Sequence, residues 1–140
     1  MVEVLSSHRV RYHTAIAVWI VIFVGLSAKF YTGSAREFVN DWGPASVAYE
    51  LFFMLLAFFW VPRSSAILPI AVTVCLMTCC VECFQLWQPP WLQALRSTVG
   101  GKILLGHQFS WWDFPAYPIG CACGWLLLHW IVRDRERASR

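Results

Sequence analysis

Four long apolar stretches dominate this chain, at about residues 14–28, 44–61, 66–87 and 111–132. Each is close to the roughly 20 residues that a helix needs to cross the hydrocarbon of a bilayer, and the first is the shortest. Hydrophobic residues make up 59% of the 140 residues and charged residues only 14%, which is more apolar surface than so short a soluble domain could bury. We therefore predict an all-α membrane protein, a bundle of four transmembrane helices forming one integral domain over residues 1–140.

The basic residues predict the orientation of the bundle. Four crossings place both termini and the turn at 62–65 on one side, and this side carries seven basic residues: Arg9, Arg11, Arg63, Arg133, Arg135, Arg137 and Arg140. The other side carries four: Lys29, Arg36, Arg96 and Lys102. The excess predicts that both termini are cytoplasmic. The first span also resembles a secretory signal, and we expect it to be retained as an anchor.

The net charge of +3 comes largely from the flanks of the apolar stretches. Such flanks suit contact with anionic lipid headgroups, so membrane lipids are the predicted partners. The charge pattern gives no argument for binding nucleic acid.

The loop over residues 88–110 is the longest connection. Pro89 and Pro90 end the third apolar stretch, and the Gly100–Gly101 pair ends the segment that follows. Within that segment Trp91, Leu92, Leu95 and Val99 fall mostly on one side of a helix, and Gln93, Arg96 and Ser97 largely on the other. We predict an amphipathic segment at the outer interface that caps the bundle. A plain interfacial loop is the alternative.

Three of the apolar stretches each contain or begin near one acidic residue: Glu50, Glu82 and Asp113. Glu82 lies about 7–8 Å below the outer end of its helix at 1.5 Å per residue, Glu50 lies at a similar depth, and Asp113 falls in the first turn of the last span. A charge at bilayer depth costs roughly 2.5–3.5 kcal/mol on insertion scales, so it is kept where it is paired or hydrated. The shared depth predicts one polar site near the outer face.

Other polar residues complete the predicted site. Gln85 shares a helical face with Glu82. Arg96 and Lys102 in the long loop are the expected counterions, and the planar fork of Arg96 suits a carboxylate or a phosphate better than an ammonium group does. The predicted cluster is Glu50, Glu82, Gln85, Arg96, Lys102 and Asp113. The same residues could instead only fix the packing of the helices, and the sequence leaves both readings open.

The last span carries a second pattern, Gly120-x-x-x-Gly124. Small residues at this spacing let two helices approach closely. We predict that both glycines pack against another helix of this chain. A homodimer face is the alternative.

No pattern predicts a metal, a cofactor or catalysis. The six cysteines lie within the third and fourth spans without zinc-site spacing, and we interpret them as small packing residues. His13 and His129 near the cytoplasmic ends leave a haem or pigment ligand as a remaining alternative. No catalytic fingerprint is present, so we assign no catalytic residue and favour a protein that is not an enzyme.

Several motifs resemble a known family. They are Lys29-Phe30-Tyr31-x-Gly33, Tyr49-Glu50, Glu82-x-x-Gln85-Leu86-Trp87-x-Pro89-Pro90, Arg96-Ser97-Thr98, Leu104-Leu105-Gly106 and Phe109-Ser110-Trp111-Trp112-Asp113-Phe114-Pro115. Over about residues 29–125 they resemble a small family of the bacterial inner membrane known as domain of unknown function 2809. That likeness implies a location in the inner membrane and implies no reaction.

A looser likeness is to the VanZ-like proteins, which are implicated in glycopeptide resistance. Their order of Glu-x-x-Gln, Arg, Asp and spaced glycines is similar to Glu82, Gln85, Arg96, Asp113, Gly120 and Gly124. The aromatic residues before Asp113 and the Pro-Pro loop depart from that pattern.

Three functions fit the sequence. The first is binding of a lipid-linked or cell-envelope component at the polar site. The second is an accessory subunit of a larger membrane complex, suggested by nine Trp, ten Phe and short loops. The third is a small enzyme acting on a lipid or isoprenoid headgroup, with one carboxylate as base.

Overall fold

A computed structural model describes residues 2–39, 43–101, 109–111 and 113–138 of the chain. Within these ranges the regular structure is helical throughout, as predicted. The elements are α1 (Val2–Lys29), α2 (Pro44–Trp60), the short 3-10 helix η2 (Ser64–Ala66), α3 (Ile67–Gln85), α4 (Pro90–Ser97) and α6 (Asp113–Ala138). Lys102, one of the predicted site residues, lies outside the described ranges.

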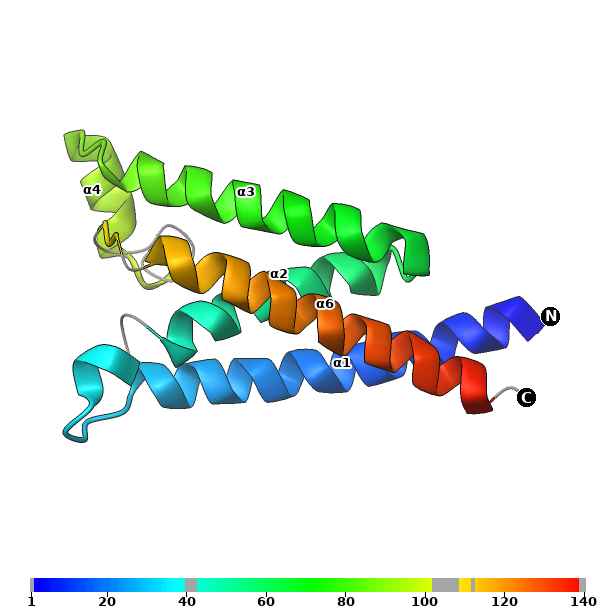
Figure 1. Ribbon diagram of the computed structural model, residues 1–140. Coiled ribbons are helices and arrows are strands. Elements are labelled where there is room, and N and C mark those ends of the chain that lie inside the picture. Colours follow the sequence, from blue (N-terminus) through cyan, green and yellow to red (C-terminus); the bar gives the residue numbers. More distant parts are fainter. Residues whose placement is uncertain (1, 40–42, 102–108, 112, 139–140) are drawn as a thin grey trace.

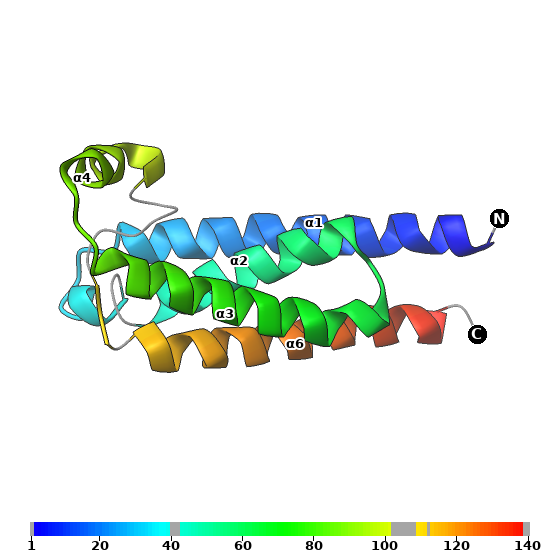
Figure 2. The same ribbon diagram turned by 90° about the horizontal axis from the view of Figure 1, so that it is seen from above.

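The four long helices run alongside one another (Figures 1 and 2). Both termini and the α2–α3 turn lie at one end of the bundle, which we call the terminal end. The α1–α2 connection and α4 lie at the opposite end, which we call the α4 end. Helix α2 is central because it packs against α1, α3 and α6.

Within the described part of the chain, three helical segments are long and apolar enough to cross a membrane: His8–Lys29, Ser64–Gln85 and Asp113–Asp134. Helix α2 is apolar but shorter, with 17 residues. Large apolar side chains point outward from the bundle, and those of Trp19 and Phe23 on α1 are 72% and 74% exposed. Such a surface is stable in lipid and unfavourable in water. The protein is therefore a multi-pass membrane protein by length, composition and surface.

Two helices extend well past the apolar stretches that predict them. Helix α1 starts at Val2, because neither Gly nor Pro occurs between Val2 and Gly25 to interrupt it. Helix α6 continues to Ala138 through a charged segment of Arg, Asp, Glu and Ala. Most of these residues form helices well, so the helix ends later than the apolar stretch does.

An apolar core fills the half of the bundle nearer the termini. Met54, Leu55 and Phe58 of α2 are fully buried there, together with Ile67 of α3 and Leu128 of α6. Among the described residues, the buried polar ones are Glu50, Thr78, Glu82, Gln85 and Arg96, which lie toward the α4 end, and Thr14 of α1, whose hydroxyl donates to Val10 of its own helix. The bundle is thus divided along its length into an apolar half and a polar half.

Helix α4 forms within the predicted amphipathic segment, but the side of the helix that is buried is not the predicted apolar side. Its buried residues are Leu92 and Arg96, one turn apart, whereas Trp91 and Leu95 are about half exposed. The predicted division into apolar and polar sides therefore does not match the buried side. Of the apolar side chains of α4, Leu92 is buried, and those of Trp91 and Leu95 point outward, as expected of a helix that lies in a membrane interface.

Candidate functional site

Glu82 is the best-connected acid of the predicted cluster. Its side chain is 1% exposed and accepts three hydrogen bonds from three segments. The Ser110 amide donates to Oε1 at 2.6 Å, and the Tyr117 hydroxyl and the Gln85 amide donate to Oε2 at 2.9 and 3.1 Å. Glu82 therefore joins α3 to the start of α6 and to the segment just before it.

Glu50 lies deeper and has fewer partners. It is 0% exposed on α2, and its Oε2 accepts a hydrogen bond from Cys121 Sγ of α6 at 3.2 Å. Thr78 of α3 comes close to the same carboxyl. The Thr78 hydroxyl, however, donates to its own helix, to the carbonyls of Val74 and Cys75. Glu50 Oε1 is left buried with no hydrogen-bond partner among the described residues.

Asp113 marks the outer edge of the cluster. It lies in the first turn of α6, where a carboxylate is favoured by the helix dipole. The Ser46 hydroxyl of α2 donates to Asp113 Oδ1 at 3.0 Å. The pair ties the N-terminal turns of α2 and α6 together.

Two residues of α6 contact the other two acids. Tyr117 is buried and its hydroxyl donates to Glu82, and Cys121 donates to Glu50. Asp113, Tyr117 and Cys121 are spaced four residues apart, so they form one stripe of α6. The structure thus gathers the three predicted acids around the first turns of α6.

Sequence reasoning missed the partners of these acids: Ser46, Ser110, Tyr117 and Cys121. For two of them a signal was present, because Tyr117 and Cys121 follow Asp113 at helical spacing. The other two contacts depend on how separate segments meet, and no pattern within one segment predicts them.

Arg96 is placed differently from the expected counterion. The side chain is 7% exposed, and its guanidinium donates to two main-chain carbonyls at the end of α3, those of Phe84 at 3.0 Å and Trp87 at 3.2 Å. It therefore caps α3, where a cation is also favoured by the helix dipole. Its recorded hydrogen bonds do not reach the carboxyls.

Three buried polar atoms lack a hydrogen-bond partner within the described part of the chain: Glu50 Oε1, Gln85 Oε1 and Arg96 Nε. All three belong to predicted site residues. An unsatisfied buried group costs about 1–3 kcal/mol, so such groups are normally met by water or by a ligand. Two of these atoms accept hydrogen bonds and one donates, which defines the chemistry of a complementary group.

The two glycines of α6 lie against α2. A Cβ at Gly120 would stand 2.7 Å from Glu50 Cβ, and one at Gly124 would stand 2.6 Å from Met54 Sδ. The absence of a side chain at Gly120 therefore lets α6 approach Glu50 closely.

The remaining sequence candidates lie apart from the acids. His13 is exposed on α1, and His129 lies near the terminal end of α6. Across the described ranges, no three His, Cys, Asp or Glu side chains are grouped in a way that could hold a metal ion.

The polar cluster falls largely within a stretch shared with a protein family. No solved structure matches the chain. Residues 34–121 match the family described as "Protein of unknown function (DUF2809)". The matched stretch contains the three acids, Tyr117 and Arg96, and it ends before the C-terminal half of α6. Because the match covers more than half of the chain, as the sequence motifs predicted, this protein belongs to the DUF2809 family.

Proposed function

We propose that this protein binds the polar headgroup of a lipid-linked or cell-envelope component at the polar cluster toward the α4 end of the bundle. The observation that carries the proposal is that Glu50 Oε1, Gln85 Oε1 and Arg96 Nε are buried and have no hydrogen-bond partner among the described residues. A structural cluster would be expected to satisfy its own polar atoms, because each unsatisfied one destabilises the fold. These three atoms can therefore form hydrogen bonds to another molecule.

The chemistry of the cluster suggests the class of headgroup. Arg96 Nε is a charged donor and suits a phosphate or carboxylate oxygen. Glu50 Oε1 and Gln85 Oε1 are acceptors and suit hydroxyl or amine groups. An anionic headgroup that also carries hydroxyl or amine groups would match both needs.

The proposed topology has four spans, with both termini in the cytoplasm of a bacterium and the α4 end at the periplasmic face of the inner membrane. Helix α2 would extend roughly 25 Å at 1.5 Å per residue, slightly less than the hydrocarbon thickness of about 30 Å. Its central position among α1, α3 and α6 favours a crossing, because its neighbours cover much of its surface. The excess of basic residues at the terminal end supports the orientation.

The test compares lipids that co-purify with the wild type, Arg96→Gln and a control, Arg63→Gln. Arg63 is exposed in the α2–α3 turn, so its variant removes the same charge at the other end of the bundle. We expect mass spectrometry to show at least one anionic species that is lost from Arg96→Gln and kept by Arg63→Gln. The glutamine in Arg96→Gln can still donate to one of the two carbonyls that Arg96 caps, so the variant is expected to fold. Circular dichroism would verify the fold.

A second variant separates binding from the capping of α3. Gln85→Met keeps the length of the side chain and removes Oε1, which has no partner among the described residues, together with the Nε2 donor to Glu82. We expect it to weaken retention of the same species. Identical lipid content in the wild type and in both variants of the cluster would refute the proposal.

A further inference from the structure

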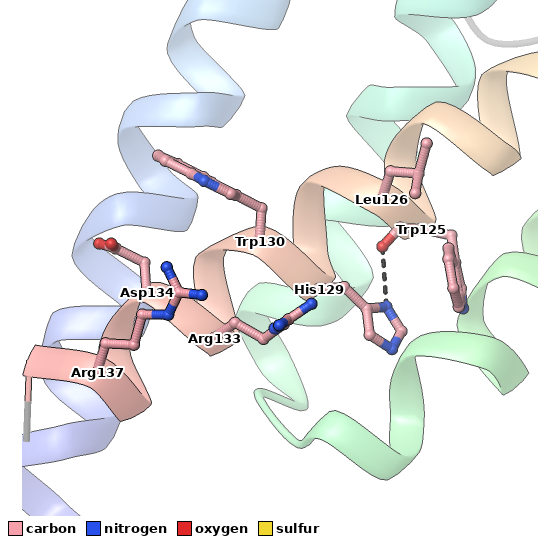
Figure 3. Close-up of a pocket in the computed structure, with 7 residues that line it drawn as sticks. All are labelled: Trp125, Leu126, His129, Trp130, Arg133, Asp134 and Arg137. Atoms are coloured by element: carbon pink, nitrogen blue, oxygen red, sulfur yellow. Dashed lines mark hydrogen bonds between the residues drawn. The ribbon is translucent and has the colours of Figure 1, made fainter. Parts of the chain in front are cut away.

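A second site lies at the terminal end of α6, well away from the acids. A surface hollow of about 520 Å³ is lined by Trp125, Leu126, His129, Trp130, Arg133, Asp134 and Arg137 (Figure 3). All of these residues come from one helix. They form two neighbouring stripes, each with a spacing of four residues. One stripe runs from Trp125 to Arg137, and the other runs from Leu126 to Asp134. The long side chains of these stripes form the walls of the hollow.

The hollow opens away from the bundle. The buried face of α6 is formed by Cys121, Gly124, Leu128 and Ile131, which recur at spacings of three and four residues. At 100° per residue, Leu126, Trp130 and Arg137 lie on the opposite side. Leu126 and Trp130 are 61% and 65% exposed. In a bilayer this face meets lipid.

The side chains change in character along this face toward the helix end. Ile119, Trp125 and Leu126 are exposed and come first along the helix, Trp130 follows, and Arg133 and Arg137 come last. Tryptophan favours the level of the headgroups, and arginine favours phosphate oxygens. This order matches the order of groups in a phospholipid, from acyl chain to phosphate.

His129 is held in a defined orientation beside the arginines. Its Nδ1–H donates to the Trp125 carbonyl at 3.0 Å, and its ring lies 4.1 Å from the Trp125 ring between centroids. Figure 3 shows the Arg133 side chain between His129 and Asp134. Arg133 and Arg137 outnumber the single carboxylate of Asp134, so these three residues give the hollow a net positive charge.

We propose that this hollow binds the headgroup of an anionic phospholipid in the leaflet at the terminal end. Arg133 and Arg137 meet the phosphate, the two tryptophans border the glycerol region, and an acyl chain follows Leu126 and Ile119 along the exposed face of α6. This site is independent of the proposed function, because it shares no residue with the acid cluster.

The experiment titrates the purified protein with phosphatidylglycerol and, separately, with phosphatidylcholine, and counts bound lipids by native mass spectrometry. The test variant is Arg133→Gln/Arg137→Gln. The control is Arg9→Gln/Arg11→Gln, which removes two exposed charges from α1 at the same end of the bundle. A basic residue near a membrane surface changes anionic-lipid affinity roughly fivefold, so the test pair should lose about 30-fold.

The results separate a site from diffuse attraction. We expect phosphatidylglycerol affinity to fall about 30-fold in the α6 pair and less than threefold in the α1 pair, with phosphatidylcholine unchanged. Asp134→Asn should tighten phosphatidylglycerol binding roughly fivefold, because it removes the opposing charge. Equal losses in both pairs, or no loss in the α6 pair, would overturn the proposal.

Discussion

The polar side chains of α6 are largely buried in the first half of the helix and largely exposed in the second half. In the first half, Tyr117 and Cys121 are buried and donate hydrogen bonds to Glu82 and Glu50. In the second half, Arg133 and Arg137 are exposed and point away from the bundle. One helix therefore combines an enclosed polar cluster with an open charged end.

This difference between the two halves of α6 shows where polar groups are stable in a membrane protein. Within the hydrocarbon region a polar side chain needs partners from the protein, because lipid supplies none. Near the headgroups, lipid and water supply partners, and long basic side chains can stay exposed. We therefore expect substitutions near α4 to change stability, and substitutions near the termini to change lipid binding with little effect on stability.

The largest expected effect is that of Glu82→Ala. The change leaves the Ser110 amide, the Tyr117 hydroxyl and the Gln85 amide without their common acceptor. We expect the free energy of unfolding to fall by about 3–5 kcal/mol, measured by steric trapping in bicelles. Arg133→Ala at the open end should stay within about 0.5 kcal/mol of the wild type. A loss below about 1 kcal/mol for Glu82→Ala would break the contrast between the two ends.

The next effect compares the two glycines of α6. A methyl group at Gly120 meets Glu50 Cβ at 2.7 Å and Val47 Cα at 3.3 Å, atoms that move only with α2. A methyl group at Gly124 meets the flexible end of Met54. We expect Gly120→Ala to cost about 2–3 kcal/mol and Gly124→Ala about 1 kcal/mol.

Thermal unfolding in detergent would measure both variants. Gly100→Ala is the control, because no atom of the described residues lies within 4 Å of a Cβ at that position. If Gly124→Ala destabilised as much as Gly120→Ala, the close approach of α2 and α6 would not be centred on Glu50.

A smaller effect is expected for Tyr117→Phe. The variant keeps the ring and removes one of the two donors to Glu82 Oε2, while Gln85 still donates to that oxygen. We expect a loss of about 1–2 kcal/mol in the same unfolding measurement. Tyr12→Phe, on an exposed side chain of α1, is the matched control. No difference between the two variants would show that the Tyr117 hydroxyl is not part of the cluster.

The sequence predicted the helical bundle because its apolar stretches were long and clearly separated. It also predicted that the acids lie toward the same end of the bundle, since position along a helix depends only on the count of residues from its end. It could not predict which groups contact each acid, because Ser110 and Tyr117 reach Glu82 through tertiary packing. The role of Arg96 in capping α3 was missed for the same reason, since it depends on the angle between α3 and α4.

The smallest expected effect lies at the edge of the cluster, where the enclosed half meets the interface. Ser46→Ala removes one hydrogen bond to Asp113, a half-buried carboxyl that is also favoured by its place at the start of α6. We expect a loss of only about 0.5–1 kcal/mol in the free energy of unfolding, with Ser97→Ala on exposed α4 as the control. If Ser46→Ala instead cost as much as Glu82→Ala, Asp113 would belong to the enclosed cluster energetically as well as spatially. The enclosed polar groups would then stabilise the bundle as strongly at its α4 end as at Glu82. The change from enclosed to open polar groups would in that case lie outside α6.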